Sequence, residues 1–391
     1  MEEALTRILE RARPLEPERV PLSNVPGRFL AEPAVAEVDL PPFPSSAMDG
    51  FAVRSADTPG MLPVVGEAAA GVPVARTLAS GEALAIATGG VVPDGADAVV
   101  PIEYVVQYDN KVEIGDGVEE GANVRPRGGD VRRGDTVVAS GTQLGAPQLG
   151  ALAACGLTEA VCARRPRAAV LATGTELAVP GSRLEVGQIY DSNRPMLEAE
   201  LVDAGASVQL SQVVSDDPDA HRAALERALE LDVVVTSGGV SVGRHDLVRA
   251  TGAELGVDEL IWGVAVKPGK PLWFGTHGQT LVFGLPGNPV SSLVGFELFV
   301  RPAVRALQGA AHPEPRFTVG RLTVAVRRTE ARDQLVRARS SLADGRVELE
   351  PLVGQESHMI ARAAGADALV LVERGTGEVA AGSEVRFLPL G

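Results

Sequence analysis

The stretch from Thr236 to Ser292 contains three glycine-rich motifs: TSGGVSVGRHD at 236–246, VKPGKP at 266–271 and GLPGNPVSS at 284–292. Lys267 and Lys270 stand close together in the middle motif, although the chain has only three lysines among its 36 basic residues. Since arginine is the usual cation of this chain, a pair of lysines suggests a site that uses compact, mobile ammonium groups. The glycine turns and the lysines together predict a pocket for a phosphorylated or otherwise anionic small molecule.

Apolar runs and helical segments alternate on both sides of this stretch. Strands are predicted at residues 167–174, 208–214, 231–239 and 280–289, where apolar residues run together before a turn. Helices are predicted at 193–205, 216–230 and 290–307, and the second of them has Asp216 or Asp217 as its cap. Strands that alternate with helices indicate a mostly parallel sheet covered on both faces.

The rest of the chain divides into shorter segments, and 391 residues predict roughly two to four domains. Residues 1–12 and 143–157 pattern as helices. Between them, residues 26–135 consist of short apolar segments cut by Gly and Pro, which is typical of a small β-rich module. After His312 the sequence is strand-like, which predicts a separate small β domain.

The composition excludes several classes of function. With 45% hydrophobic and 22% charged residues the chain is ordinary globular protein, and its net charge of −15 comes without the basic stripe that a nucleic acid needs. Acidity also argues against an anionic membrane surface, and no apolar run approaches the ~18 residues of a membrane span. Cys155 and Cys162 are too few for a disulfide framework or a Cys-rich zinc site. These features predict a cytoplasmic protein that binds neither nucleic acid nor membrane.

Three predicted loops lie where ligands bind in open α/β sheets, beyond the carboxyl ends of the strands. They cover residues 173–176, 237–243 and 284–289, and two of them lead into helices whose N-termini favour anions. Four carboxylates interleave with these loops: Glu176, Asp191, Asp232 and Asp246. Acids would repel an anionic ligand unless a cation lies between them, and Mg²⁺ prefers one or two carboxylates together with substrate oxygens. We therefore expect a site for an anion with Mg²⁺.

Each of these features also has a purely structural interpretation. A glycine-rich turn after a strand is commonly just a turn, Asp246 could cap a helix, and Asp232 begins a strand, where a carboxylate needs exposure or a partner. The sequence has no Walker loop and no GxGxxG fingerprint, and its five histidines show no metal-ligand spacing.

The N-terminal half contributes a second constellation. It comprises LPPFPSSAMDGFAV at 40–53, ATGGVVPDGADAVVPIE at 87–103 and NVRPRGGDVRRGD at 123–135, with Asp49, Thr88 and Asp130 as polar candidates. The prolines before Asp49 hold the backbone of its turn stiffly. Taken alone, these segments favour a stiff β module that has surface turns.

These motifs, together with TGTEL at 173–177 and IYDSNRPML at 189–197, resemble the MoeA family, the molybdopterin molybdenumtransferases that include the gephyrin E domain. The resemblance covers nearly the whole chain and implies a multidomain α/β plus β fold. Its implied parts are a segmented N-terminal linker and dimer domain at 1–43 and 135–164, an inserted β-rich domain at 44–134, a molybdopterin-binding α/β domain at 165–312 and a C-terminal β-barrel at 313–391. It also implies a homodimer whose active cleft lies between the α/β domain of one subunit and the inserted domain of the other.

The resemblance further implies insertion of molybdate into adenylylated molybdopterin, with Mg²⁺, releasing AMP and molybdenum-molybdopterin. The predicted catalytic residues are Asp49, Thr88, Asp130, Glu176, Asp232, Asp246, Lys267 and Lys270. The predicted pterin-binding residues are Thr173, Gly174, Ser237, Gly238, Gly239, Ser241, Gly243, Pro286, Gly287, Asn288, Pro289 and Ser357. The predicted metal ligands are Glu176, Asp232 and Asp246. The resemblance also implies a partner protein that delivers the adenylylated pterin.

The chain departs from the family pattern at three places. Pro44-Ser45 stands where the family commonly has Asp-Asn, Gly129 replaces an acid, and Gly263 stands where a further lysine is common. These departures affect the expected recruitment of the oxyanion, and a relative that uses tungstate remains an alternative. The sequence is also compatible with a molybdopterin-binding carrier without turnover and with a scaffold for a partner peptide.

Overall fold

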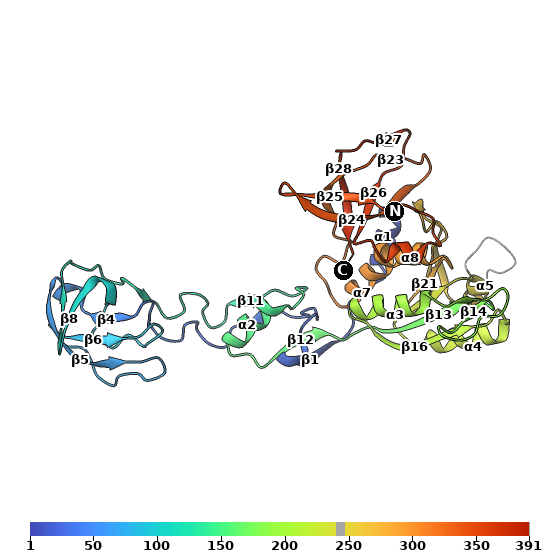
Figure 1. The fold of residues 1–391 in the computed structure, drawn as a ribbon. Helices are drawn as coiled ribbons and strands as arrows, with labels where there is room; N and C mark the ends of the chain where they lie inside the picture. The colour runs from blue at the N-terminus through green and yellow to red at the C-terminus, as the bar shows by residue number, and fades with distance from the viewer. Residues whose placement is uncertain (240–246, 391) are drawn as a thin grey trace.

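The computed structural model describes residues 1–239 and 247–390 as an elongated molecule (Figure 1). A β-rich module forms one end, and a connecting segment joins it to an α/β sheet that carries a β-barrel (Figure 1). No helix in these residues combines the length and hydrophobicity needed to cross a membrane. The residue bounds of the four expected domains stay a prediction.

The α/β part contains a six-stranded sheet in the order β16-β13-β17-β21-β20-β18. Its strands are β13 (Arg167–Thr173), β16 (Ser207–Val214), β17 (Val233–Ser237), β18 (Asp258–Trp262), β20 (Trp273–His277) and β21 (Thr280–Leu285). The first four in sheet order are parallel, and β20 runs antiparallel to both of its neighbours, β21 and β18, so the predicted mostly parallel sheet is confirmed.

Helices cover both faces of this sheet, as expected, because successive strand residues point to opposite sides. They are α3 (Asn193–Asp203), α4 (Pro218–Ala228), α5 (Leu247–Glu254), α6 (Pro289–Gly295) and α7 (Arg301–Leu307). Val170 packs with α3, α6 and α7 in one core, whereas Leu171 packs with α4 and α5 in the other. The long helix predicted at 290–307 is continuous but has a π-helical segment, η4 (Phe296–Val300), before Pro302. Proline donates no backbone hydrogen bond, so the helical register shifts most easily there.

The strand-like C-terminal sequence forms a closed barrel, which confirms the β domain expected after His312. Its strands are β22 (Thr318–Leu322), β24 (Asp333–Ala343), β25 (Arg346–Pro351), β26 (Ala368–Val372) and β28 (Glu384–Pro389). Closure follows because β24 pairs with both β25 and β26. A short ladder of β23 (Val326–Arg327) with β27 (Glu378–Val379) and a short helix, α8 (Ile360–Ala363), complete this part. The sequence did not indicate that β19 (Val266–Lys267), from the α/β part, would add in parallel to β24.

The N-terminal helix α1 (Glu2–Leu9) packs on the α/β part through Ile8 and is shorter than the predicted 1–12. In the connecting segment, β1 (Pro17–Pro21) pairs with β12 (Glu159–Ala163), and β2 (Ala34–Val35) pairs with β11 (Thr136–Val138). A 3₁₀ turn, η1 (Leu22–Asn24), follows β1. The helix expected at 143–157 is α2 (Ala146–Ala154), which has Pro147 in its first turn as predicted.

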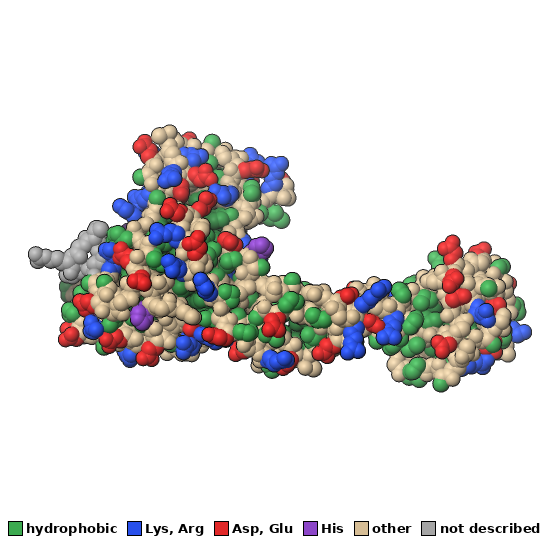
Figure 2. Space-filling model, turned by 180° about the vertical axis from the view of Figure 1, so that it is seen from behind, with side chains coloured by type: hydrophobic (Ala, Val, Ile, Leu, Met, Phe, Trp, Pro, Cys, Tyr) green, Lys and Arg blue, Asp and Glu red, His purple; other side chains and the backbone are tan. Residues whose placement is uncertain are grey.

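The inserted module is β-rich, as its sequence predicts. Its sheet runs β7-β4-β6-β5-β9-β8, formed by β4 (Gly50–Val53), β5 (Gly60–Ala68), β6 (Ala83–Ile86), β7 (Ala98–Pro101), β8 (Val105–Tyr108) and β9 (Lys111–Ile114). Two 3₁₀ turns, η2 (Ser55–Asp57) and η3 (Ile102–Tyr104), lie between strands. Beside this sheet, β3 (Ser45–Ser46) pairs with β10 (Val124–Arg125). Basic side chains gather where the module joins the connecting segment (Figure 2).

Candidate functional site

A crevice is expected at one edge of the sheet, between β13 and β17. The chain leaves β13 to form β16 on one side and then returns to form β17 on the other, so the strand order reverses there. Ligands of open α/β folds bind at such a switch point, beyond the carboxyl ends of the strands. Thr173 ends β13 and Ser237 ends β17, and the Thr173 hydroxyl donates to the Ser237 carbonyl oxygen over 3.3 Å. The predicted residues of these two loops therefore lie together.

The loop after β17 approaches the end of β13 so closely that a side chain at Gly238 would not fit. Gly238 has a φ of +87°, and a Cβ there would stand 2.6 Å from the carbonyl oxygen of Thr173. A Cβ on Gly287 would lie 3.6 Å from the Cα of Gly238, so the loop after β21 packs directly against the loop after β17. The backbone N–H of Gly238 donates to the carbonyl oxygen of Leu285 over 3.1 Å, so this glycine serves the close packing of the loops after β17 and β21.

The loop that follows β13 carries Thr175 and Glu176, which are both exposed. It continues into β14 (Leu177–Ala178), which pairs with β15 (Ile189–Tyr190). The carboxylate of Asp216 accepts hydrogen bonds of 3.2 Å from both the backbone N–H and the hydroxyl of Thr175. Asp217, by contrast, caps α4 by accepting the backbone N–H of Ala220 over 2.8 Å. The sequence analysis did not identify Asp216 as a site residue. The available signal was the adjacent pair Asp216 and Asp217, because a helix needs only one of them as its cap.

Asp232 does not belong to this edge, and its prediction as a metal ligand is wrong. It precedes β17, and its backbone N–H donates to Arg167 at the start of β13, so it lies at the amino edge of the sheet. Its carboxylate accepts from Arg164 at 2.6 and 2.8 Å and from the Arg167 backbone at 2.7 Å. Burial opposes ionisation, but the hydrogen bonds from both arginines outweigh it and lower the pKa of Asp232 to about 2. Asp232 is therefore an ion-pair partner within the fold.

The remaining predicted metal ligands are not brought together within the described residues. Asp246, Ser241 and Gly243 lie outside residues 1–239 and 247–390. In those two ranges no group of three His, Cys, Asp or Glu side chains is placed to hold a metal ion. Asp191 is buried and accepts from the backbone and side chain of Arg194 at 3.1 and 2.9 Å, so it serves the start of α3.

The predicted lysines lie beside the barrel. Lys267 is exposed and borders a cavity of about 400 Å³ that is also lined by Arg327, Gln334 and Gln355 of the barrel. Lys270 is exposed in the same turn, and its carbonyl oxygen accepts from Val264 and Leu272 at 2.9 Å. Glu356 also lines this cavity, so two cationic side chains face one acidic side chain. A lining with this excess of positive charge suits a small oxyanion.

Ser357 comes to the same place from the barrel. Its carbonyl oxygen accepts the backbone N–H of Val290 over 3.0 Å, next to Pro289 at the start of α6. Asn288 is the N-cap of α6 but makes no capping bond with its side chain. The buried guanidinium of Arg337 donates to the carbonyl oxygens of Gly354, Glu356 and Met359, which fixes the segment that carries Ser357.

The second constellation lies in the inserted module. Asp49 accepts hydrogen bonds from the backbone N–H of Thr88 at 2.6 Å and from its hydroxyl at 2.9 Å, and these bonds lower the pKa of Asp49. The β3–β10 pair and the contact of the Asp130 N–H with the Leu40 carbonyl oxygen at 3.0 Å bring the three N-terminal motifs together. Within one chain, however, this constellation lies at the opposite end of the molecule from the sheet (Figure 1).

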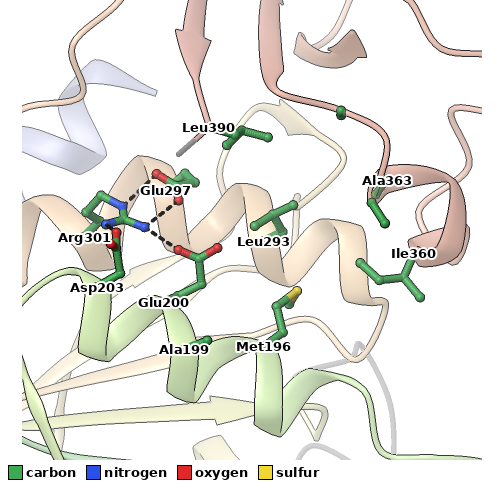
Figure 3. A pocket seen from close by; sticks show the side chains of 12 residues that line it. Met196, Ala199, Glu200, Asp203, Leu293, Glu297, Arg301, Ile360, Ala363 and Leu390 are labelled. Atoms are coloured by element: carbon green, nitrogen blue, oxygen red, sulfur yellow. Dashed lines mark hydrogen bonds and ion pairs between the residues drawn. The ribbon is translucent and has the colours of Figure 1, made fainter. Parts of the chain in front are cut away.

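A further cavity of about 440 Å³ lies between α3, α6 and α8 and was not predicted from the sequence. Met196, Leu293 and Ile360 line one part of it, and an ion cluster lies at the other (Figure 3). In this cluster Arg301 donates to Glu200, to Asp203 at 2.6 Å and to Glu297 at 2.9 Å. Burial and the neighbouring Glu297 raise the pKa of Glu200 to about 7.

Comparisons with known proteins cover nearly the whole chain. Residues 1–156 match the MoeA N-terminal region (domains I and II), residues 169–306 a probable molybdopterin-binding domain and residues 319–390 the MoeA C-terminal region (domain IV). Molybdopterin molybdenumtransferase 2 of Mycobacterium tuberculosis is 37% identical, over 98% of this chain and 97% of that protein. Molybdopterin molybdenumtransferase of Haemophilus influenzae is 33% identical, over 100% and 98%.

Solved structures agree with these matches. A molybdopterin biosynthesis MoeA protein from Pyrococcus horikoshii superimposes with a TM-score of 0.82 at 32% identity, covering 99% of this chain and 98% of that one. A second structure of a MoeA protein from the same organism gives a TM-score of 0.86 at 28% identity. Matches in all three regions, in full-length relatives and in whole-chain structures lead to one assignment: the chain belongs to the MoeA family.

Proposed function

We propose that this chain is a transferase of molybdenum cofactor biosynthesis that inserts molybdate into adenylylated molybdopterin, releasing AMP and molybdenum-molybdopterin. The switch point beyond β13 and β17 supports this most directly, because Thr173, Ser237 and the loops after β17 and β21 pack together at the edge where open α/β sheets bind their ligands. Several contacts with the ligand are needed, because micromolar binding requires about −8 kcal/mol.

The Lys267 cavity is the proposed place for the oxyanion. Arg327 and Lys267 supply positive charge there, which exceeds the single acidic side chain of Glu356 in the same lining. Because the cavity joins the α/β part to the barrel, an oxyanion held there would lie next to the start of α6, where Ser357 contacts Val290. Lys270, in the same turn, would add charge at the entrance.

We further propose that Mg²⁺ assists the reaction. Glu176 follows β13 at the crevice, and hydrogen bonds from the backbone and side chain of Thr88 lower the pKa of Asp49. One or two such carboxylates are the donor set that Mg²⁺ takes beside a phosphorylated substrate. When bound, the ion would act as a Lewis acid and template for cleavage of the phosphoanhydride. Asp216, by holding Thr175, would fix the direction of the Glu176 loop.

A homodimer would bring the two constellations together. The inserted module, with Asp49 just before β4, lies at one end of the elongated molecule and the α/β sheet at the other (Figure 1). A second subunit is therefore the simplest source of Asp49 and Asp130 for the crevice. We include in this proposal a cytoplasmic location and a partner that delivers the adenylylated pterin. Tungstate in place of molybdate stays an alternative substrate.

Mass spectrometry of nucleotide products tests this function. The purified protein, adenylylated molybdopterin and Mg²⁺ should yield AMP only when molybdate is added, and tungstate in a parallel reaction compares the two oxyanions. Pterin binding without AMP release would instead favour the carrier without turnover. Absence of pterin binding would contradict both.

A further inference from the structure

Asn193, the first residue of α3, occupies a buried position between two of the site loops. Its side-chain nitrogen donates to the hydroxyl of Ser237 and to the carbonyl oxygen of Gly287, both over 2.7 Å. Asn193 is only 9% exposed, and its amide oxygen has no partner among residues 1–239 and 247–390. An acceptor left without a partner costs about 1–3 kcal/mol on burial. Packing alone therefore does not explain why an asparagine stands at this position.

The two bonds of Asn193 belong to a larger buried network. The hydroxyl of Ser237 lies 3.4 Å from the carbonyl oxygen of Pro286, which also accepts from the hydroxyl of Ser292 in α6. Ser237 and Ser292 are 2% and 0% exposed, so solvent does not supply these partners. One carboxamide thus links the start of α3 to the loops after β17 and β21.

We propose that Asn193 is a positioning residue, which holds the Ser237–Gly239 and Pro286–Pro289 loops in the mutual arrangement that pterin binding requires. The inference rests on the proposed function and adds to it a residue that does not itself touch the substrate. Its physical basis is preorganisation: loops fixed before binding lose less conformational freedom when the ligand arrives. Both amide hydrogens are used, so a side chain without two donors cannot replace Asn193.

Two substitutions separate the donor role from packing. Asn193→Ala removes both donors and most of the side chain. Asn193→Asp keeps the shape but places a carboxylate oxygen against the carbonyl oxygen of Gly287, where no hydrogen bond can form. Ser192→Ala is the matched control. Ser192 occupies the N-cap position of the same helix, and its side chain makes no capping hydrogen bond there.

Amide hydrogen exchange on the protein without ligand gives the first readout. In Asn193→Ala and Asn193→Asp, amides of residues 236–239 and of Gly287, Asn288 and Val290 should exchange about tenfold faster, which corresponds to ~1.4 kcal/mol of lost local stability. Ser192→Ala should leave both loops unchanged. Wild-type exchange in Asn193→Asp would overturn the proposal, and that comparison is available even if Asn193→Ala does not fold.

Steady-state kinetics gives the second readout. The KM for adenylylated molybdopterin should rise about tenfold in both Asn193 variants with little change in kcat, since a loss of prearranged binding affects ground state and transition state alike. A fall in kcat at unchanged KM would contradict the positioning role. If the wild-type protein releases no AMP at all, the proposed function fails, and the exchange comparison still decides whether Asn193 holds the loops.

Discussion

The carboxylate of Asp232 is held by Arg164 and Arg167, and its pKa is lowered to about 2. Such a group stabilises the folded state above its unfolded pKa of about 4, and that contribution is lost as the pH falls through about 2. We expect Asp232→Asn to lower the free energy of unfolding by about 2 kcal/mol at pH 7 and to leave turnover by the folded protein unchanged. Urea unfolding at several pH values measures the first effect. A lower kcat in a fully folded Asp232→Asn variant would instead mean that Asp232 takes part in the reaction.

Glu200 shows the opposite dependence on pH. Burial raises its pKa from 4.5 to about 7, Glu297 adds to this effect, and Arg301 opposes it. A raised carboxyl pKa stabilises the fold below the unfolded pKa, and this stabilisation is lost as the pH rises through about 7. Glu200→Gln should therefore raise the free energy of unfolding by roughly 1 kcal/mol near pH 8.5 and change it little near pH 4.5. Equal unfolding curves at both pH values would show that Arg301 keeps Glu200 ionised throughout.

At the scale of the element, Asp216 in the turn after β16 anchors the loop between β13 and β14 through hydrogen bonds from Thr175. Asp216→Ala removes both hydrogen bonds to Thr175, so we expect kcat/KM to fall about tenfold while the melting temperature changes little. Asp217→Ala is the matched control. It removes the α4 cap and should cost about 1 kcal/mol of stability without affecting kcat/KM. If the two variants behaved alike, the anchor would have no functional role.

Elements that depend on local patterns were predictable from the sequence. Apolar runs and capping residues placed β13, β17 and α4 near their observed positions, because periodicity and caps act within a few residues. The pairing of β19 with the barrel was not predictable, since its partner Gln334 is distant in sequence. The same limit applies to Asp216, whose partner Thr175 is 41 residues away.

The positions of the candidate site residues could be predicted only where the direction of the neighbouring strands was taken into account. Thr173 and Ser237 follow neighbouring parallel strands, and parallel strands end at one edge of a sheet, so their contact follows from the sequence. Asp232 precedes its strand, which places it at the other edge although it lies among the site motifs in sequence. The network around Asn193 depends on side-chain packing between three elements and has no local signal.

At the scale of the whole molecule, the proposed dimer predicts complementation between inactive subunits. Asp49→Ala removes an acid from the inserted module, whereas Lys267→Ala changes the cavity beside the barrel at the opposite end (Figure 1). If each cleft uses the module of one subunit and the sheet of the other, a mixed dimer has one cleft with both residues intact. Random pairing makes about half of the dimers mixed, so coexpression should restore about a quarter of wild-type AMP release.

The control for this experiment pairs two changes in the same constellation. Asp49→Ala coexpressed with Thr88→Ala should restore no activity, because both residues belong to the same module and every mixed cleft then carries one defect. Analytical ultracentrifugation of each mixture establishes that dimers form. Recovery in the control would mean that Asp49 and Thr88 do not serve the same cleft. No recovery with Lys267→Ala despite mixed dimers would mean that each cleft is built from a single chain. Since the two constellations lie at opposite ends of the chain, that outcome would require the connecting segment to bend and carry the module to the sheet (Figure 1).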